Sequence, residues 1–387
     1  MMQLLMMDSS LLIRLGCQLA AAMQLLSVLG TAAGAVAQVI LIAFVGVVAA
    51  FFPREQPLLT PEALRPISRI ANDIFLPFLS AAVLGARING AALREDWVLL
   101  PAGLCVTVLG YAVADVNALF ARPSPALLPA LRVAVAHPNA FALPLLLLRY
   151  LCERPVVNAE FGGDDEECLE RGAAKLCVFL TAWHVIFWTY AYSTLERIDG
   201  GAGREASARL WLRRALLQPN MIGVYAGVLI GVSPLRRLLF FGATPLRPLG
   251  LAVETLGEPV VATTVLIMAA ALANGEKRRR RAKDAAEPEG GAARAALWFV
   301  VVKLVVIPAI GYPLVSLLPR LPGGELTKLV LLLELAMPGA QTVLVTLNAL
   351  GQGHVAEAIA PAYLAQYLSA VLTLTAFTAW ALLITYR

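Results

Sequence analysis

An apolar helical run is interrupted at Ala136-His137-Pro138-Asn139-Ala140-Phe141-Ala142-Leu143-Pro144. A second run, far along the chain, is interrupted at Glu334-Leu335-Ala336-Met337-Pro338-Gly339-Ala340-Gln341-Thr342. Proline removes a backbone donor and clashes with the carbonyl four residues before it, so each helix must kink or break there. In hydrocarbon, freed backbone groups are tolerated only where protein or a wet cavity satisfies them. A pair of such breaks in corresponding positions therefore points to a transporter binding site.

The composition of the chain places both breaks in a membrane protein. Hydrophobic residues make up 59%, charged residues 15%, and the mean hydropathy is +0.75. A soluble domain has about 45–50% apolar and about 25% charged residues. Because a run of about 20 apolar residues crosses a bilayer as a helix, the sequence predicts an all-α polytopic protein. The expected spans are 33–52, 67–86, 97–120, 126–148, 174–195, 216–233, 246–273, 296–318, 326–350 and 358–385.

The ten spans divide into two halves. We expect a first five-helix repeat over 31–195, a cytosolic linker over 196–215 and a second repeat over 216–387, because 196–215 contains the turn-rich run Asp199-Gly200-Gly201-Ala202-Gly203. Five is odd, so the second half enters from the opposite face, and any repeat is inverted. Residues 1–30 leave three interpretations open: a signal-like segment, an eleventh helix, or an amphipathic helix on the membrane surface.

Loop charges predict the orientation. The loop 274–291 contains Lys277-Arg278-Arg279-Arg280-Arg281, whereas the loop Glu153–Glu170 is acidic. Lysine and arginine in short loops mark the cytoplasmic side, so the basic loop is expected in the cytosol. A basic run can also bind nucleic acid, but beside a membrane helix we interpret it as topogenic or as a contact to lipid headgroups.

The five cysteines form no zinc-binding pattern. Cys17, Cys105 and Cys177 fall in apolar stretches, where an inert thiol is expected. Cys152 and Cys168 bracket the acidic loop and could pair if that loop faces an oxidising lumen. The sequence leaves both states of this pair open.

Several stretches resemble the auxin efflux carrier superfamily, and most closely its PIN-LIKES branch. Pro138-Asn139-Ala140-Phe141-Ala142-Leu143-Pro144-Leu145 is similar to a family signature in which Asn139 and Pro144 are kept, while Pro138, Phe141 and Ala142 depart from it. The further matches are Leu59–Arg65, Phe75–Pro77, Trp97–Pro101, Arg122–Pro125, Pro219–Gly223, Gly231–Arg236, Leu256–Pro259, Met337–Ala340 and Gln366–Tyr367.

The resemblance implies a secondary carrier with ten helices in two inverted five-helix repeats, whose fourth and ninth helices break at prolines and cross. It also implies indole-3-acetic acid or a related amphipathic carboxylate as substrate. The endoplasmic reticulum membrane is the implied location, with the plasma membrane as the alternative. A homodimer is left open.

A site for such an anion can be assembled from the two breaks. A broken helix offers unpaired N–H groups and a positive end, and amides add donors without a permanent charge. The expected substrate-binding residues are Asn139, Pro138, Phe141, Pro144, Pro338, Gln341 and Val343. The alternative is a purely structural role, in which the two proline kinks only shape the packing and bind no ligand.

Charges within spans are costly and are therefore candidates for function. The expected coupling or polar-network residues are Glu258, Glu254, Lys303, Glu334 and His137. Glu254 and Glu258 can share a face, and Lys303 can pair with Glu334 or Glu258. His137 either titrates near neutral pH or caps carbonyls freed at the break. We interpret His184, among Trp183, Phe187 and Trp188, as part of an interfacial aromatic belt.

Other functions receive less support from the sequence. It contains no P-loop, metal-ligand cluster or nucleophile triad, so we expect neither an enzyme nor a cofactor or metal, and no nucleic-acid partner. Two alternatives to the auxin-like anion remain: a carrier of small dicarboxylates with the same fold, which needs a second fixed cation near the breaks, and a membrane receptor or scaffold that does not transport.

Overall fold

The computed structural model describes residues 30, 33–34, 37–53, 55–198, 213, 215–282, 290–318 and 320–386. Within these ranges the regular structure is helical, apart from one antiparallel bridge between Pro138 and Gly339. The expected all-α class is therefore confirmed. The segment 1–29 and residues 199–212 of the expected linker lie outside the described residues.

The first half of the chain contains the helix Ala37–Phe51, α2 to α10, and π-helical or 3₁₀ turns η1 to η3. Their bounds are α2 Pro61–Ile70, η1 Ala71–Phe75, α3 Leu76–Arg87, α4 Gly90–Glu95, α5 Leu99–Ala121, α6 Leu128–Ala136, α7 Ala142–Cys152, α8 Pro155–Asn158, η2 Ala159–Phe161, α9 Asp165–Ile186, η3 Phe187–Ala191 and α10 Tyr192–Glu196.

The second half continues with α12 to α20 and one π-helical turn, η4. The bounds are α12 Pro219–Val232, α13 Leu235–Phe240, α14 Arg247–Gly257, α15 Pro259–Ala282, α16 Gly290–Val301, η4 Val302–Val306, α17 Ile307–Ser316, α18 Gly324–Ala336, α19 Thr342–Ala349 and α20 Gly353–Thr385.

Six helices of the described chain are long and apolar enough to cross a membrane. They are Pro61–Arg87, Leu99–Ala121, Asp165–Glu196, Arg247–Arg278, Leu297–Ser316 and Gly353–Thr385. The helices Ala37–Phe51, α7 and α12 are apolar but shorter. At 1.5 Å per residue, neither α6 nor α7 alone is long enough to cross, and the same holds for α18 and α19. Each pair is one expected span divided at its proline break.

The expected span 246–273 lies within one membrane-length helix, Arg247–Arg278. Within it α14 ends at Gly257 and α15 begins at Pro259, with Glu258 in helical conformation between them. The missing N–H of Pro259 interrupts the hydrogen-bond pattern at this point without ending the span.

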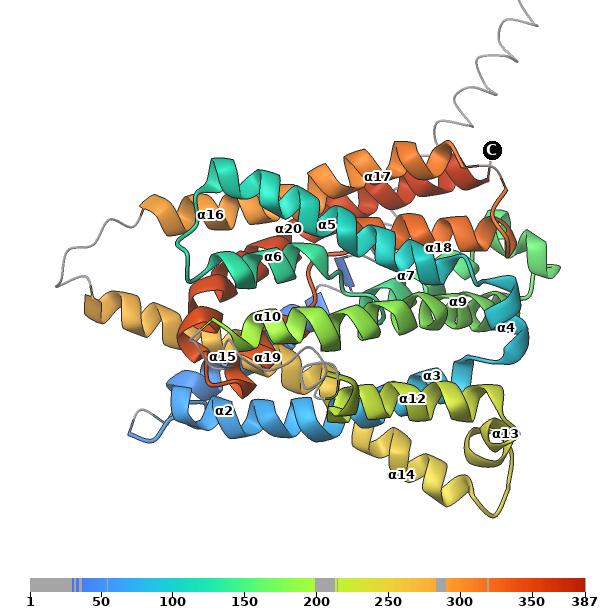
Figure 1. The fold of residues 1–387 in the computed structure, drawn as a ribbon, viewed down its shortest axis with the longest axis horizontal. Coiled ribbons are helices and arrows are strands. Elements are labelled where there is room, and N and C mark those ends of the chain that lie inside the picture. Colours follow the sequence, from blue (N-terminus) through green and yellow to red (C-terminus); the bar gives the residue numbers. More distant parts are fainter. Residues whose placement is uncertain are drawn as a thin grey trace, which may run out of the picture.

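The helices form layers with the broken pairs inside (Figure 1). Along one side, α3 packs on α12 and α14; along the other, α5 packs on α16 and α17. The α3–α12 contact is close because Gly223 lies over the α3 backbone, where an added Cβ would lie 2.3 Å from the Pro77 carbonyl oxygen.

The described parts of the two charged segments lie at opposite ends of the molecule (Figure 1). The expected loop 274–291 is wrong as far as residue 282, because α15 continues as helix to Ala282, and residues 283–289 lie outside the described residues. A disulfide joins Cys152, at the end of α7, to Cys168 in α9, with the Cα atoms 5.7 Å apart. At the other end Lys277 donates to the Ala50 carbonyl at 2.5 Å. Disulfides persist in oxidising compartments and basic loops lie in the cytosol, so both features give the same orientation.

Candidate functional site

The two proline breaks contact each other directly. Asn139 N donates to the Pro338 carbonyl at 2.8 Å, and Ala340 N donates to the His137 carbonyl at 2.9 Å. These bonds form the bridge between Pro138 and Gly339. Because each break supplies an acceptor to the other, the freed backbone groups are satisfied within the protein, as the hydrocarbon environment requires.

Helix α20 supports the second break. Gln366 Oε1 accepts from Gly339 N at 2.7 Å, Tyr363 Oη donates to the Ala340 carbonyl at 3.1 Å, and Tyr367 Oη donates to the Gly339 carbonyl at 3.2 Å. All three α20 residues are buried. They hold the irregular segment between α18 and α19 in one conformation.

A cavity of about 400 Å³ opens beside the crossing. Of the expected binding residues, Asn139, Phe141 and Gln341 lie on its wall. The first residues of α7 and α19, Ala142 and Thr342, also line it, so both positive helix ends face the cavity. Its other lining residues are Gln38, Val39, Ile42, Leu76, Leu79, Ser80, Val83, Ala140, Leu143, Leu145, Leu146, Leu180, Trp183, His184, Trp188, Val260, Val261, Thr264, Val265, Ala340 and Tyr367.

The polar groups of this cavity are neutral. Asn139 Nδ2 donates to Tyr367 Oη at 3.0 Å, and Thr264 Oγ1 donates to Gln341 Oε1 at 3.4 Å. Among the described residues that line the cavity, none is Lys, Arg, Asp or Glu. His184 Nδ1 is buried without a hydrogen-bond partner in the described structure.

Four of the expected binding residues lie outside the cavity wall. Pro138, Pro144, Pro338 and Val343 do not line it, and Val343 is fully buried. The prolines shape the breaks, which is the role that their missing N–H predicts.

His137 does not line the cavity, and its ring packs against the rings of Trp183 and Phe187. Its Nδ1 lies 3.0 Å from the Val133 carbonyl oxygen, and its ring meets the rings of Trp183 and Phe187 edge-on at 5.6 and 5.1 Å. The Val133 carbonyl already accepts from the His137 backbone N–H at 3.1 Å, so the ring shares an acceptor that the break did not free, and the two roles left open for His137 stay predictions. The interfacial interpretation of the His184 cluster is wrong, because His184, Trp183, Phe187 and Trp188 are all buried.

The structure brings only some of the expected polar-network residues close to one another. Lys303 and Glu334 are both fully buried, but no ion pair joins them; Lys303 Nζ donates to the Val135 carbonyl at 2.9 Å. Glu254 pairs with Arg247 at 3.0 Å, and Glu258 is exposed. Glu254 and Glu258, which were expected to be able to share a face, are half-buried and exposed, respectively. The expected Lys303–Glu258 pair is absent from the described structure, because Lys303 is fully buried and Glu258 is exposed.

A buried ion pair was not anticipated from the sequence. Lys175 Nζ lies 2.5 Å from Asp96 Oδ1 and donates to the Gly323 carbonyl at 3.0 Å, while Thr327 Oγ1 donates to the same Asp96 oxygen at 3.1 Å. The pair links the α4–α5 connection to α9 and α18. The available signal was Lys175 itself, a single charge at the start of an apolar run.

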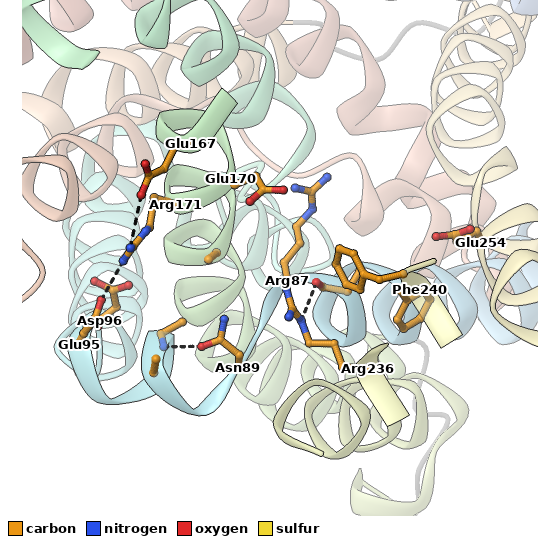
Figure 2. A pocket seen from close by; sticks show the side chains of 15 residues that line it. Arg87, Asn89, Glu95, Asp96, Glu167, Glu170, Arg171, Arg236, Phe240 and Glu254 are labelled. Carbon is orange, nitrogen blue, oxygen red and sulfur yellow. Dashed lines mark hydrogen bonds and ion pairs between the residues drawn. The ribbon is translucent and has the colours of Figure 1, made fainter. Parts of the chain in front are cut away.

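A second cavity, of about 670 Å³, is lined by Glu167, Glu170 and Arg171 from the first turns of α9 and by residues of α3, α4 and α13 (Figure 2). Figure 2 shows Arg87, Arg171 and Arg236 among several carboxylates. Arg171 pairs with Glu95 at 3.3 Å and with Glu167 at 3.5 Å. Burial lowers the pKa of Arg236, and Glu170 opposes this shift. Because five carboxylates line it against three arginines, and Arg171 already pairs with two of these carboxylates, this cavity is the weaker candidate for an organic anion.

Comparison with known proteins identifies the family of this chain. Residues 31–380 match the model of the family described as membrane transport protein. The chain belongs to this family. The expected membership is therefore confirmed, and the chain is a multi-pass integral membrane protein of a transporter family.

One relative of this chain is a PIN-LIKES protein. The chain is similar to Protein PIN-LIKES 1 of Arabidopsis thaliana, with 22% identity over 273 residues. The match covers 62% of this chain and 57% of the relative, so the chain spans somewhat more than half the length of that protein.

Proposed function

We propose that this protein is a secondary carrier of an amphipathic organic anion, such as indole-3-acetic acid, which binds in the cavity beside the two proline breaks. One observation carries the proposal: Asn139 and Gln341, one from each break, face the same apolar cavity. A site built from both halves can change its exposure when the halves move relative to one another.

The carboxylate of such a ligand suits the polar part of the cavity. The starts of α7 and α19 each carry a partial positive charge of about half a unit, and the Asn139 and Gln341 amides lie beside them. Neutral donors stabilise an anion without the strong attraction of a fixed cation, so the ligand can leave again.

The aromatic ring of the ligand suits the apolar part. Phe141, Trp183 and Trp188 line the cavity, with leucines and valines completing its walls. Aromatic pairs in offset or edge-on geometry contribute about 0.5–1.5 kcal/mol beyond the area that they bury. A volume of about 400 Å³ falls within the usual range of about 300–1,000 Å³ for small-molecule sites.

We infer ten spans in two inverted five-helix repeats as the architecture of this carrier. The support is the matched position of the breaks: α6–α7 is the fourth span of the first half and α18–α19 the fourth of the second. The endoplasmic reticulum membrane is a proposal that rests on the resemblance to the PIN-LIKES branch, and a homodimeric state stays open.

A dicarboxylate is the competing substrate. It requires a second positive group beside the first, and no lysine or arginine is among the described residues that line the cavity. A non-transporting receptor would bind the same ligand without moving it, so only a flux experiment separates it from a carrier.

The test is uptake of radiolabelled indole-3-acetic acid into proteoliposomes that contain the purified protein, with imposed voltage and pH gradients. We expect saturable uptake that unlabelled indole-3-acetate competes for and succinate does not. Saturable binding without flux would favour the receptor, and competition by succinate would favour the dicarboxylate carrier. Absence of both binding and flux would overturn the proposal.

A further inference from the structure

Lys303 lies fully buried in the middle of the eighth expected span, in the π-helical turn η4. A buried ammonium is costly unless it is hydrogen-bonded or paired. Its one hydrogen bond in the described structure is from Nζ to the Val135 carbonyl, at 2.9 Å. Val135 belongs to the last turn of α6, immediately before the first proline break.

The hydrogen bonds at the end of α6 explain why this carbonyl needs a new donor. In an uninterrupted α-helix the Val135 carbonyl accepts from the N–H of the residue four positions later, which is Asn139. Here Asn139 N donates to the Pro338 carbonyl instead. The Lys303 ammonium therefore replaces, on Val135, the donor that Asn139 gives to the other break.

Lys303 suits this position by its positive charge as well as by its N–H donors. The carboxyl end of a helix carries a partial negative charge, and an ammonium there is favourable. Glu334, on α18, attracts Lys303 through space, but its two carboxylate oxygens have no hydrogen-bond partner in the described structure. His137 is the other titratable group that acts on Lys303. Lys303 is thus bonded to the broken helix rather than to its counter-charge.

We propose that Lys303 is a positioning residue of the crossover: by capping the Val135 carbonyl it fixes the segment 135–139 and so holds Asn139 toward the cavity. The role in substrate binding rests on the proposed function, whereas the capping role does not. In this arrangement α20 holds the second break through neutral side chains and Lys303 holds the first through a cation.

The first arm of the test uses ligand-free protein. Hydrogen–deuterium exchange is measured over the peptide that contains residues 133–140 in wild type, Lys303→Met and Glu334→Gln. Lys303→Met removes the cap, so we expect at least tenfold faster exchange there. Glu334→Gln keeps the cap and should exchange like wild type.

The second arm measures equilibrium binding of radiolabelled indole-3-acetate. We expect Lys303→Met to raise Kd about tenfold, Glu334→Gln to change it less than twofold, and the double variant to remain as weak as Lys303→Met. If Lys303 served only to neutralise Glu334, the double variant would recover wild-type binding and exchange, and the proposal would fall.

Two further outcomes are decisive. If Lys303→Met is not monodisperse, Lys303→Gln replaces it, because its amide is neutral and too short to reach Val135 fully; unchanged exchange in that variant overturns the proposal. If wild type does not bind indole-3-acetate, the proposed substrate is wrong, but accelerated exchange in the lysine variants still supports the capping role.

Discussion

Asn139 uses its backbone and its side chain for different partners. The backbone N–H bonds to the Pro338 carbonyl, and the side-chain amide donates to Tyr367 Oη on α20. Tyr367 Oη in turn donates to the Gly339 carbonyl. Asn139 thus connects both breaks to the cavity, and the Tyr367 hydroxyl orients the Asn139 side-chain amide.

Replacement of this hydroxyl should weaken binding. In Tyr367→Phe the Asn139 amide loses its acceptor, and a hydrogen bond contributes about 0.5–1.5 kcal/mol net, so we expect Kd for indole-3-acetate to rise roughly three- to tenfold. Tyr363→Phe is the matched control: it loses a similar bond, to the Ala340 carbonyl, without contact to Asn139. Equal effects of the two variants on Kd would contradict the positioning of Asn139 by Tyr367.

Among individual residues, the sequence predicted those at the two breaks better than those that support the breaks. Asn139, Phe141 and Gln341 adjoin the prolines in sequence, so local pattern alone identified them as candidates. Tyr363 and Gln366 reach Ala340 and Gly339 from α20. No local pattern encodes that packing: the sequence marks Gln366 only as part of a family match, without a supporting role, and does not mark Tyr363 at all.

Among the elements, α3 and α12 show how a close helix contact depends on a missing side chain. Gly223 lies directly over the α3 backbone at Pro77. Close approach of this kind is typical of small residues at helix interfaces in membranes. The contact should be intolerant of any added carbon atom.

Gly223→Ala tests that contact. The new methyl group would meet the Pro77 carbonyl at 2.3 Å, and overpacking typically costs about 1–3 kcal/mol. We expect a lower thermal unfolding midpoint in detergent. Gly90→Ala is the control, because the space around Gly90 at the start of α4 is open; alanine there should leave the midpoint unchanged or raise it. A Gly223→Ala midpoint equal to that of wild type would show that the helices are less tightly packed.

Element boundaries were predicted where a proline or a polar run marks them. Both breaks fell at their prolines, but the start of α9 did not fall where expected. We placed the fifth span at 174–195, whereas α9 begins at Asp165 with Asp164 as its cap, accepting from Glu166 N and Glu167 N. Hydropathy gives the apolar core of a helix; capping residues extend it into polar sequence.

For the whole molecule, the disulfide and the basic segment define opposite ends. The start of α9, which carries Cys168 of the disulfide, lies at one end, and the last turns of α15, which carry the basic residues, lie at the other (Figure 1). Sequence charge predicted the two faces, but it could not decide whether the cysteines pair, because pairing depends on α7 and α9 meeting in space. The pairing supplies independent support for the orientation.

Labelling in sealed, cytosolic-side-out vesicles tests this orientation. A membrane-impermeant maleimide should label Arg280→Cys from outside the vesicle, since Arg280 is exposed near the end of α15. Glu166→Cys, exposed at the start of α9 close to the disulfide, should be labelled only after the vesicles are opened. Labelling of Glu166→Cys in intact vesicles would place the disulfide end in the cytosol and reverse the proposed topology.

The central claim is that the substrate binds between the two proline breaks. The most direct measurement is saturable uptake of radiolabelled indole-3-acetic acid into proteoliposomes by Asn139→Ala, beside Arg87→Gln in the second cavity. We expect Asn139→Ala, folded as judged by a monodisperse elution profile, to lose saturable uptake while Arg87→Gln retains it. Retained uptake in Asn139→Ala, or loss only in Arg87→Gln, would contradict binding beside the breaks and move the site to the other cavity.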